Sequence, residues 1–262
     1  MAILYFKARF QTDVLNVPST PLYKHNLYDV RHCAGTLIGS RWVLTAGHCV
    51  YLHNKEVIGV ALGFYDLKDP LDTKTRLTRD VKRIILHPDF KMLPSYHPLN
   101  DLALLELSEA VTNIPTLSLI DTNNIDGYNA TVIGWGEMEY GDRSSILQEV
   151  TIPVIANATS NKADWYSNQI LDTMLTAGVE QGGKGVCWGD SGGPLLIWSN
   201  SKWKQAGIVS WSKKSPELKC ETPKKPGVYT RVNSFASWIK SVTGINTNSG
   251  TFTGLNPSTS HP

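Results

Sequence analysis

A glycine-rich segment carries the residues best suited to chemistry. In residues 185–194, GVCWGDSGGP, the hydroxyl of Ser191 lies between glycines and follows the acid Asp190. This sequence is poor for a helix or strand but suits a tight loop that presents a hydroxyl beside free backbone N–H groups. Gly189 lets the backbone curl so that its N–H and that of Ser191 can face one developing oxyanion, as a serine nucleophile of acyl transfer requires. An ordinary glycine turn is the alternative interpretation.

Two further residues suit a general base and the group that orients it. His48 follows the apolar run 42–45, and the small residues before it leave the imidazole room to reach a distant hydroxyl. Asp101 heads the apolar run 102–107, where a buried carboxylate is costly unless it accepts a strong hydrogen bond, such as one from an imidazole N–H. Taken singly, His48 has a structural interpretation and Asp101 that of a loop cap.

Composition and charge limit the classes of protein to which the chain can belong. Its 262 residues are 41% hydrophobic and 18% charged, which fits one large all-β domain or two small ones. The net charge of +2 and the scattered basic residues indicate no nucleic-acid or polyanion partner. No apolar run is long enough to span a membrane. Residues 1–6 lack the features of a secretion signal, so a secreted form is expected to need a leader absent from this sequence.

Short apolar runs separated by turn residues indicate a mainly β chain from residue 28 onward. Apolar residues at helical spacing predict a helix over 233–242, and 163–175 is a weaker helix candidate. The polar residues 245–262 are expected to form a disordered tail. The predicted strands are 36–38, 42–45, 57–62, 81–86, 102–107, 130–133, 150–155, 194–198, 206–211 and 227–232.

Four cysteines, at positions 33, 49, 187 and 220, allow three pairings, and their spacing alone does not choose among them. A zinc site is the competing interpretation, but the sequence has no Cys-x-x-Cys pair or other close ligand spacing. Two disulfides and an oxidising compartment are therefore favoured.

Seven short segments in a fixed order extend the pattern around His48, Asp101 and Ser191. They are CAGTLI from 33, WVLTAGHC from 42, NDLALL from 100, GWG from 134, GDSGGP from 189, GIVSW from 207 and PGVYTRV from 226. From about residue 33 to 242 the chain thus resembles the trypsin/chymotrypsin family of serine endopeptidases, whose triad has this chain order. The resemblance implies an all-β, chymotrypsin-like fold of two packed six-stranded antiparallel β-barrels with a C-terminal helix.

The resemblance also implies a role for each residue in these motifs. His48 is the general base and then the acid, Asp101 orients and stabilises its imidazolium, and Ser191 is the nucleophile that forms the acyl-enzyme. The N–H groups of Gly189 and Ser191 form the oxyanion hole. Ser210 bonds near Asp101, and residues 210–212, Ser210, Trp211 and Ser212, pair with the substrate backbone as an added strand.

The family pattern implies two disulfides, Cys33–Cys49 and Cys187–Cys220. Other bridges common in the family are absent, since both partners are replaced at the aligned pairs Ser160 with Thr176 and Ala130 with Ile197. No metal or other cofactor is expected, because Phe64 stands where a calcium-liganding acid would be.

The sequence departs from the family at its start. The family needs a freed Ile-Val-Gly-Gly-type terminus, whose ammonium pairs with the acid at Asp190 and orders the oxyanion hole, and no such motif precedes Cys33. The true start is absent or unusual, another cation replaces the ammonium, or the hole is incompletely formed. The last case would make the chain a non-catalytic, protease-like binding protein, which is the alternative function. An α/β-hydrolase esterase does not fit, because it requires a different motif and triad order.

Alignment on Cys187 and Ser191 predicts an apolar primary pocket. Gly185 lies at its floor, where trypsin-like members carry an Asp, so a substrate Lys or Arg would be buried without a partner. Val186 narrows the pocket, Gly227 leaves its wall open and Ser212 lies at its mouth, although the insertion 213–219 can reshape the entrance. Cleavage after apolar or aromatic residues is therefore expected.

The domain organisation expected is an N-terminal segment of unclear role (1–27), a protease domain (28–244, two barrels divided near 110–130) and the polar tail (245–262). Expected partners are peptide or protein substrates, with protein protease inhibitors as a class that the resemblance allows, and no nucleic acid or membrane. A secreted monomer is expected. Asn129 and Asn157 each begin a glycosylation sequon.

Overall fold

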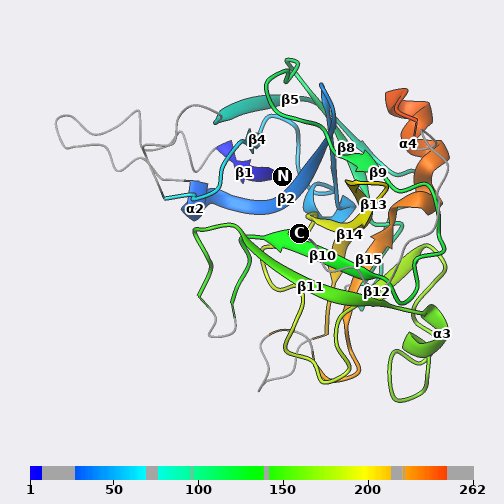
Figure 1. Ribbon diagram of the computed structural model, residues 1–262. Coiled ribbons are helices and arrows are strands. Elements are labelled where there is room, and N and C mark those ends of the chain that lie inside the picture. Colours follow the sequence, from blue (N-terminus) through cyan, green and yellow to red (C-terminus); the bar gives the residue numbers. More distant parts are fainter. Residues whose placement is uncertain are drawn as a thin grey trace.

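The protein folds into two antiparallel β-barrels, shown in the computed structural model of Figure 1. The structure describes residues 1–7, 27–68, 76–95, 97–138, 142–213, 220 and 222–246. The two barrels and a C-terminal helix are the architecture that the sequence predicted.

The first barrel is built from the N-terminal part of the chain. Its strands alternate in direction and close a ring, and facing apolar residues such as Leu44 and Leu104 are fully buried. In ring order they are β1 (Ala2–Phe6), β2 (Arg31–Gly39), β3 (Trp42–Thr45), β8 (Ala103–Leu107), β5 (Leu77–Leu86) and β4 (Ile58–Leu62).

The second barrel is a ring of six strands closed by the pairing of β13 with β14. A seventh, short strand, β9 (Ser118–Leu119), joins β14 in parallel. In ring order the six are β13 (Pro194–Ser199), β10 (Asn129–Gly134), β11 (Gln148–Ile155), β12 (Met174–Ala177), β15 (Gly227–Arg231) and β14 (Lys202–Trp211).

Strand β1 corrects the expected domain division. Residues 1–27 were expected to lie before the protease domain, but β1 pairs with both β2 and β4 and completes the first barrel. Its residues Ala2, Ile3 and Leu4 are buried, so removing them from water is the physical reason for the pairing. The first domain therefore starts at β1, and residues 8–26 lie outside the described part of the chain.

The helical elements of the described residues are short. They are α2 (Leu27–Val30), a 3₁₀ turn (Gly47–Cys49), α3 (Asn157–Ser160), a second 3₁₀ turn (Val232–Phe235) and α4 (Ala236–Thr243). Two short strands, β6 (Lys91–Met92) and β7 (Pro98–Leu99), pair with each other apart from the barrels. The helix predicted over 233–242 is thus a 3₁₀ turn followed by α4. It ends at Gly244, whose positive φ of 73° suits glycine.

The weaker helix candidate, 163–175, is wrong. Ser167 and Asn168 have positive φ, a left-handed conformation that no helix tolerates, and Met174 begins β12. Of the predicted tail, residues 247–262 lie outside the described residues.

Helix α4 joins the two halves of the molecule. It follows β15 of the second barrel, yet Ile239, which is fully buried, belongs to the hydrophobic core of the first barrel. Trp238 and Val242 pack against the same core. Helix α4 therefore fastens the second barrel to the first.

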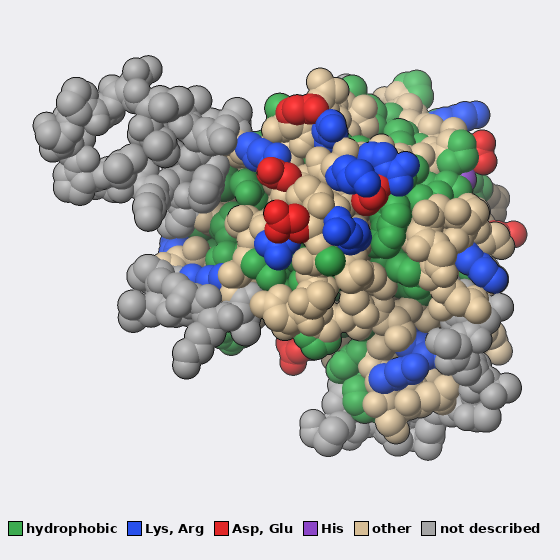
Figure 2. Space-filling model, turned by 90° about the horizontal axis from the view of Figure 1, so that it is seen from above, with side chains coloured by type: hydrophobic (Ala, Val, Ile, Leu, Met, Phe, Trp, Pro, Cys, Tyr) green, Lys and Arg blue, Asp and Glu red, His purple; other side chains and the backbone are tan. Residues whose placement is uncertain are grey.

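Charged side chains of both signs alternate on the face seen from above, as Figure 2 shows. Strand β5, at the top of Figure 1, contributes several ion pairs of that kind. Lys82 and Arg83 both bind Glu106, Arg79 lies 3.8 Å from Glu109, and Lys7 binds Asp80. These basic residues are therefore largely neutralised by neighbouring acids.

Candidate active site

His48 and Asp101 form a tightly hydrogen-bonded pair in the segments after β3 and before β8 of the first barrel. The chain enters a 3₁₀ turn directly after β3, which places His48 beside the segment that precedes β8. Nδ1 of His48 lies 2.7 Å from Oδ2 of Asp101, and the backbone N–H of His48 donates to Oδ1 at 2.8 Å. Two bonds from one residue fix both the position and the ring orientation of the imidazole.

Two hydroxyls of the second barrel complete the surroundings of Asp101. Ser210 on β14 donates to Oδ2 of Asp101 at 2.6 Å, as the family resemblance implied, and Thr230 on β15 donates to its backbone carbonyl at 2.7 Å. Asp101 is only 2% exposed, so these bonds replace the water that its charge would otherwise bind.

The charge state of the pair follows from these contacts. Burial disfavours the imidazolium of His48, but the charge of Asp101 and the hydrogen bond to it outweigh burial and raise the pKa of His48. Burial likewise opposes ionisation of Asp101, but His48 and the bonds from Ser210 and the His48 N–H hold the pKa of Asp101 below its usual value. The pair can therefore accept and hold a proton on His48 while Asp101 remains ionised.

The loop that carries Ser191 is attached to the first barrel. The N–H of Ala34, on β2, donates to the carbonyl of Ser191 at 2.7 Å. A Cβ at Gly192 would lie 2.3 Å from the Ala34 carbonyl oxygen, and φ is +80° there, so only glycine fits this close approach. The glycines around Ser191 thus let the loop lie directly against β2.

Two N–H groups in this loop are left open. Asp190, Gly192 and Gly193 donate to backbone carbonyls, whereas within the described chain the N–H groups of Gly189 and Ser191 donate to none. Gly189 has a φ of +100°, which aims its peptide in a way that an L-residue rarely allows. The loop therefore offers two adjacent unpaired donors beside a serine.

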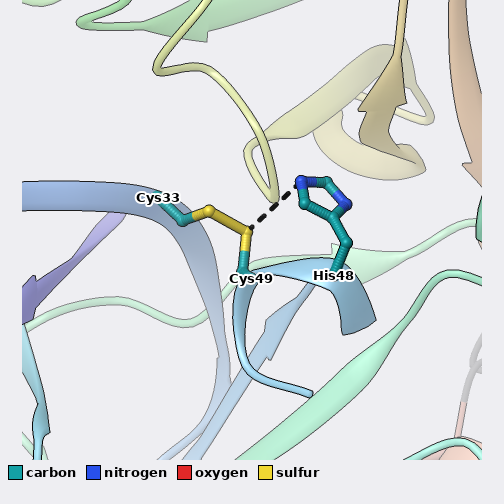
Figure 3. Close-up of side chains that lie close together, drawn as sticks. All are labelled: Cys33, His48 and Cys49. Carbon is teal, nitrogen blue, oxygen red and sulfur yellow. Dashed lines mark hydrogen bonds between the residues drawn. A yellow bond between two sulfur atoms is a disulfide. The ribbon is translucent and has the colours of Figure 1, made fainter. Parts of the chain in front are cut away.

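Ser191 and His48 are not hydrogen-bonded to each other in the part of the chain that the structure describes. Nε2 of His48 instead lies 3.8 Å from Sγ of Cys49, as Figure 3 shows. Hydrogen bonds to a catalytic base are often long in a protein without substrate and tighten when it binds. The structure therefore brings His48 and Asp101 together, and no hydrogen bond joins Ser191 to His48 within the described residues.

The side chain of Asp190 points away from Ser191 into the protein. Its Oδ1 accepts the N–H of Gly136 at 2.8 Å and its Oδ2 that of Cys187 at 3.0 Å. Burial raises the pKa of Asp190 to about 6, although these two bonds and the charge of Arg31 lower it. Each N–H comes from a different loop, so the carboxylate holds residues 187–191 against the end of β10.

Comparisons with known proteins agree with this geometry. The family model described as Trypsin matches residues 20–239. The chain belongs to the trypsin family. It is 35% identical over 221 residues to "Trypsin-1" of Astacus astacus, a match that covers 81% of this chain and 88% of that protein.

Two further relatives in the trypsin family are much longer proteins. The chain is 37% identical over 228 residues (84% of its length) to "Serine protease filzig" of Drosophila melanogaster and 36% identical over 216 residues (79%) to "Serine proteinase stubble" of the same species. It spans only 13% of the first and 26% of the second. These matches, together with Trypsin-1, make the protein a serine endopeptidase by family.

The predicted pocket residues lie on neighbouring elements of this trypsin-family domain. Val186 is buried in the same cluster as Val209 on β14 and Tyr229 on β15, while Gly185 is half-buried. Trp211 ends β14 and pairs with Val228, the neighbour of Gly227. Ser212 directly follows β14 and is half-buried, and most of the insertion 213–219 lies outside the described residues.

The two predicted disulfides are both formed, Cys33–Cys49 beside His48 and Cys187–Cys220 beside the Ser191 loop. Within the described residues, the one cluster of metal-ligand types is Cys33, His48 and Cys49, and its two sulfurs are already bonded to each other. At the positions of one missing family bridge, Ser160 and Thr176 face each other with their hydroxyl oxygens 2.5 Å apart.

Some residues at the site escaped the sequence analysis. The sequence analysis assigned Thr230 only to a strand and gave His97 no role. The ring of His97 stacks on that of Trp211, with centroids 4.1 Å apart and planes 13° from parallel. The ring of Tyr166 meets the Trp211 ring edge-on. A lone histidine before a proline gave no signal for this contact, since the stacking depends on chain segments far apart in sequence.

No helix within the described part of the chain has the length and apolar character needed to cross a membrane.

Proposed function

We propose that the protein hydrolyses peptide bonds through an acyl-enzyme, with Ser191 as nucleophile, His48 as general base and acid, and Asp101 as the group that orients His48. The observation that carries this proposal is the bonding of Asp101, whose carboxylate accepts from Nδ1 and N of His48 and from Ser210. With Nδ1 bonded in this way, Nε2 is the nitrogen left to exchange a proton during the reaction, in place of its 3.8 Å contact with Sγ of Cys49.

The proposed reaction follows from these positions. His48 Nε2 takes the proton of Ser191 Oγ as Oγ bonds to the substrate carbonyl carbon, and the imidazolium then gives that proton to the leaving amine as the C–N bond breaks. In the second half of the reaction, water attacks the acyl carbonyl carbon as His48 takes its proton, and His48 returns that proton to Ser191 Oγ as the ester C–O bond breaks. The open N–H groups of Gly189 and Ser191 are the groups we assign to the carbonyl oxygen as it becomes negative.

The substrate side chain is proposed to be apolar or aromatic. No carboxylate stands at Gly185 to pair with a substrate cation, and Val186 presents an apolar, buried surface. Burying Lys or Arg there without a partner would cost several kcal/mol. Residues 210–212, at the end of β14, are the proposed edge for pairing with the substrate backbone.

We also propose that the protein is secreted, since both disulfides link catalytic segments and would be reduced in the cytosol.

Labelling of Ser191 by an organophosphate tests the catalytic proposal. The proposal expects one label per molecule on Ser191, and Ser191→Ala should abolish both label and turnover, with a loss on the order of 10⁶ in kcat. A folded wild-type protein that takes no label would instead favour the non-catalytic, protease-like binding protein.

Matched peptides that end in Leu, Phe, Arg or Glu test the pocket. Higher kcat/KM for Leu or Phe is expected. A preference of about tenfold or more for Arg or Glu, worth about 1.4 kcal/mol, would refute the assignment of Gly185 and Val186.

A further inference from the structure

Two lysines from separate segments of the chain converge on the ring of Tyr166. Lys213 lies two residues beyond the end of β14, and Lys225 lies two residues before the start of β15. Their Nζ atoms lie 5.6 Å and 5.3 Å from the centroid of the Tyr166 ring, within the range of a cation–π contact. Tyr166 is buried, and its hydroxyl donates to the carbonyl of Pro226. An anchored aromatic ring thus holds two half-buried ammonium groups near each other, here named the lysine pair.

The charge of the lysine pair is not neutralised by carboxylates of the described residues. The Asp164 carboxylate lies 2.6 Å from Nζ of Lys224, whereas Lys225 reaches only the Asp164 backbone carbonyl, at 3.2 Å. Burial and the charge of Lys213 lower the pKa of Lys225, and the charge of Asp164 offsets them only in part. A further negative charge at this place would therefore stabilise both ammonium groups.

Trp211 connects the lysine pair to the catalytic residues. It ends β14, and its ring meets that of Tyr166 edge-on, with centroids 5.4 Å apart. Ser210, the residue before it, donates to Asp101. The chain from Ser210 to Lys213 therefore leads from the catalytic centre to the lysine pair, along the edge that we assign to the substrate backbone.

The position of the lysine pair along that edge selects a part of the substrate. The substrate residue that directly precedes the cleaved bond enters the pocket beside Val186, and the residues before it follow the edge beyond Ser210. An extended substrate advances about 3.3 Å per residue, as the strand does, so the lysine pair faces one of about three residues that precede the pocket residue.

We propose that Lys213 and Lys225 form a secondary subsite that binds an Asp or Glu side chain of the substrate, upstream of the apolar or aromatic residue in the primary pocket. The inference rests on the proposed function, because the direction of the substrate follows from cleavage after the pocket residue. It adds a charged determinant to an apolar one, since an ammonium group attracts a carboxylate and repels a second cation.

Other charged groups around the lysine pair do not supply that determinant. Burial and the charge of Lys213 lower the pKa of His97, so His97 is largely neutral at neutral pH. Lys224 is compensated by its bond to Asp164 and by the charge of Glu180. Within the described residues, the positive charge left to meet a substrate beside Tyr166 is therefore that of the lysine pair.

Matched peptides test the subsite through turnover. The peptides share one pocket residue, and each of the preceding positions carries Asp, Asn or Lys in turn. At one position the wild type should favour Asp over Asn by about fivefold in kcat/KM at low salt, the discrimination that partly exposed ion pairs supply. Lys should be the poorest residue at that position, and added salt should reduce all these differences.

Three variants assign the preference to the lysine pair. The double variant Lys213→Met/Lys225→Met keeps apolar chains over Tyr166 and should bring the Asp-to-Asn ratio to about one, because both charges are gone. Lys213→Arg keeps the charge and should keep the preference. Lys162→Met, the matched control, removes an exposed lysine four residues before Tyr166 and should keep it as well.

A binding measurement separates the subsite from the chemistry. In the Ser191→Ala background, calorimetric titration should show the Asp peptide binding about fivefold more tightly than the Asn peptide, and the double variant should lose that difference. Equal Kd values for the two peptides would overturn the proposal, as would a preference that survives in the folded double variant or disappears in Lys162→Met. If the wild type cleaves none of the peptides but the difference in Kd is present, the catalytic proposal fails and the subsite stands.

Discussion

At the scale of single residues, the site is organised around the Asp101 carboxylate. Its bonds from His48 and Ser210 were predictable, because each residue lies in a motif with a recognisable neighbourhood. The bond from Thr230 to the Asp101 carbonyl, and the burial of Arg31, were not. Both depend on which strands of the closed barrels become neighbours, and no local pattern in the sequence encodes that.

Replacing Asp101 by Asn tests whether its charge sets the state of His48. The change keeps the shape but removes the charge that raises the pKa of His48. We expect kcat to fall by about 10⁴-fold, because a neutral amide neither holds the imidazole in the productive tautomer nor stabilises the imidazolium. The wild-type acid limb of kcat/KM should have its midpoint above the ordinary histidine value of about 6.5, since the base must be neutral to act. A wild-type midpoint below that value would contradict the assignment.

The two sequons are expected to differ in use. Asn129 begins β10 and its side chain is exposed, whereas the Asn157 amide donates to the carbonyls of Leu171 and Met174. Attaching a glycan to Asn157 would break these bonds. Peptide mapping of protein from a glycosylating host should find hexose on Asn129 and not on Asn157, and Asn129→Gln should remove it. A glycan on Asn157 would show that Asn157 is modified before its hydrogen bonds to Leu171 and Met174 form.

At the scale of elements, sequence patterns located most strands but missed β1, β12 and the two-residue strands β6, β7 and β9. Ala2–Phe6 is a short apolar run with no alternation, which resembles a fragment of any buried segment, and its pairing with β2 and β4 appears only in the closed barrel. Met174–Ala177 lies in a stretch whose apolar spacing suggested a helix, but its four residues are all buried between β11 and β15. Burial on both faces removed the periodicity that would have identified it.

The bridge Cys33–Cys49 fixes the turn that contains His48 to the first barrel. It joins β2 to the 3₁₀ turn that contains His48. The double variant Cys33→Ser/Cys49→Ser should lose about 2–5 kcal/mol of unfolding free energy, measured by denaturant titration. Its kcat should also fall at a temperature where it remains folded, because the turn is then free to move. Full activity in a folded double variant would restrict the bridge to a role in stability.

At the scale of the whole molecule, the site exists only where the two barrels meet. His48 and Asp101 come from the first barrel, and Ser191, Ser210 and Thr230 come from the second. Helix α4 follows the second barrel and packs on the core of the first, which holds the two barrels together. The family motifs predicted the two-barrel architecture, whereas the contacts that join the barrels required the structure.

The junction should make stability depend on pH in a way that a single variant can isolate. The pKa of Asp101 is held low in the folded protein, so its ionised form contributes stability above the unfolded value of about 3.9, and that stability is lost as pH falls through the lower folded value. Other carboxylates with lowered pKa values, such as Glu106, add to the same acid-side loss, whereas Asp190, whose pKa is raised, acts in the opposite sense between about pH 4 and 6.

The difference between wild type and Asp101→Asn removes these shared contributions. Because Asn cannot ionise and cannot raise the pKa of His48, the destabilisation that it causes should be largest between about pH 5 and 6.5. It should shrink at higher pH, as His48 loses its proton, and at lower pH, as the wild-type carboxylate becomes protonated. Denaturant unfolding from pH 7 down to pH 2 measures that difference, with Ser191→Ala as a matched change in the same site that leaves the Asp101 charge intact. The Ser191→Ala difference should stay constant with pH. A pH-independent loss for Asp101→Asn would mean that Asp101 joins the barrels through its shape and hydrogen bonds, and that its charge serves only His48.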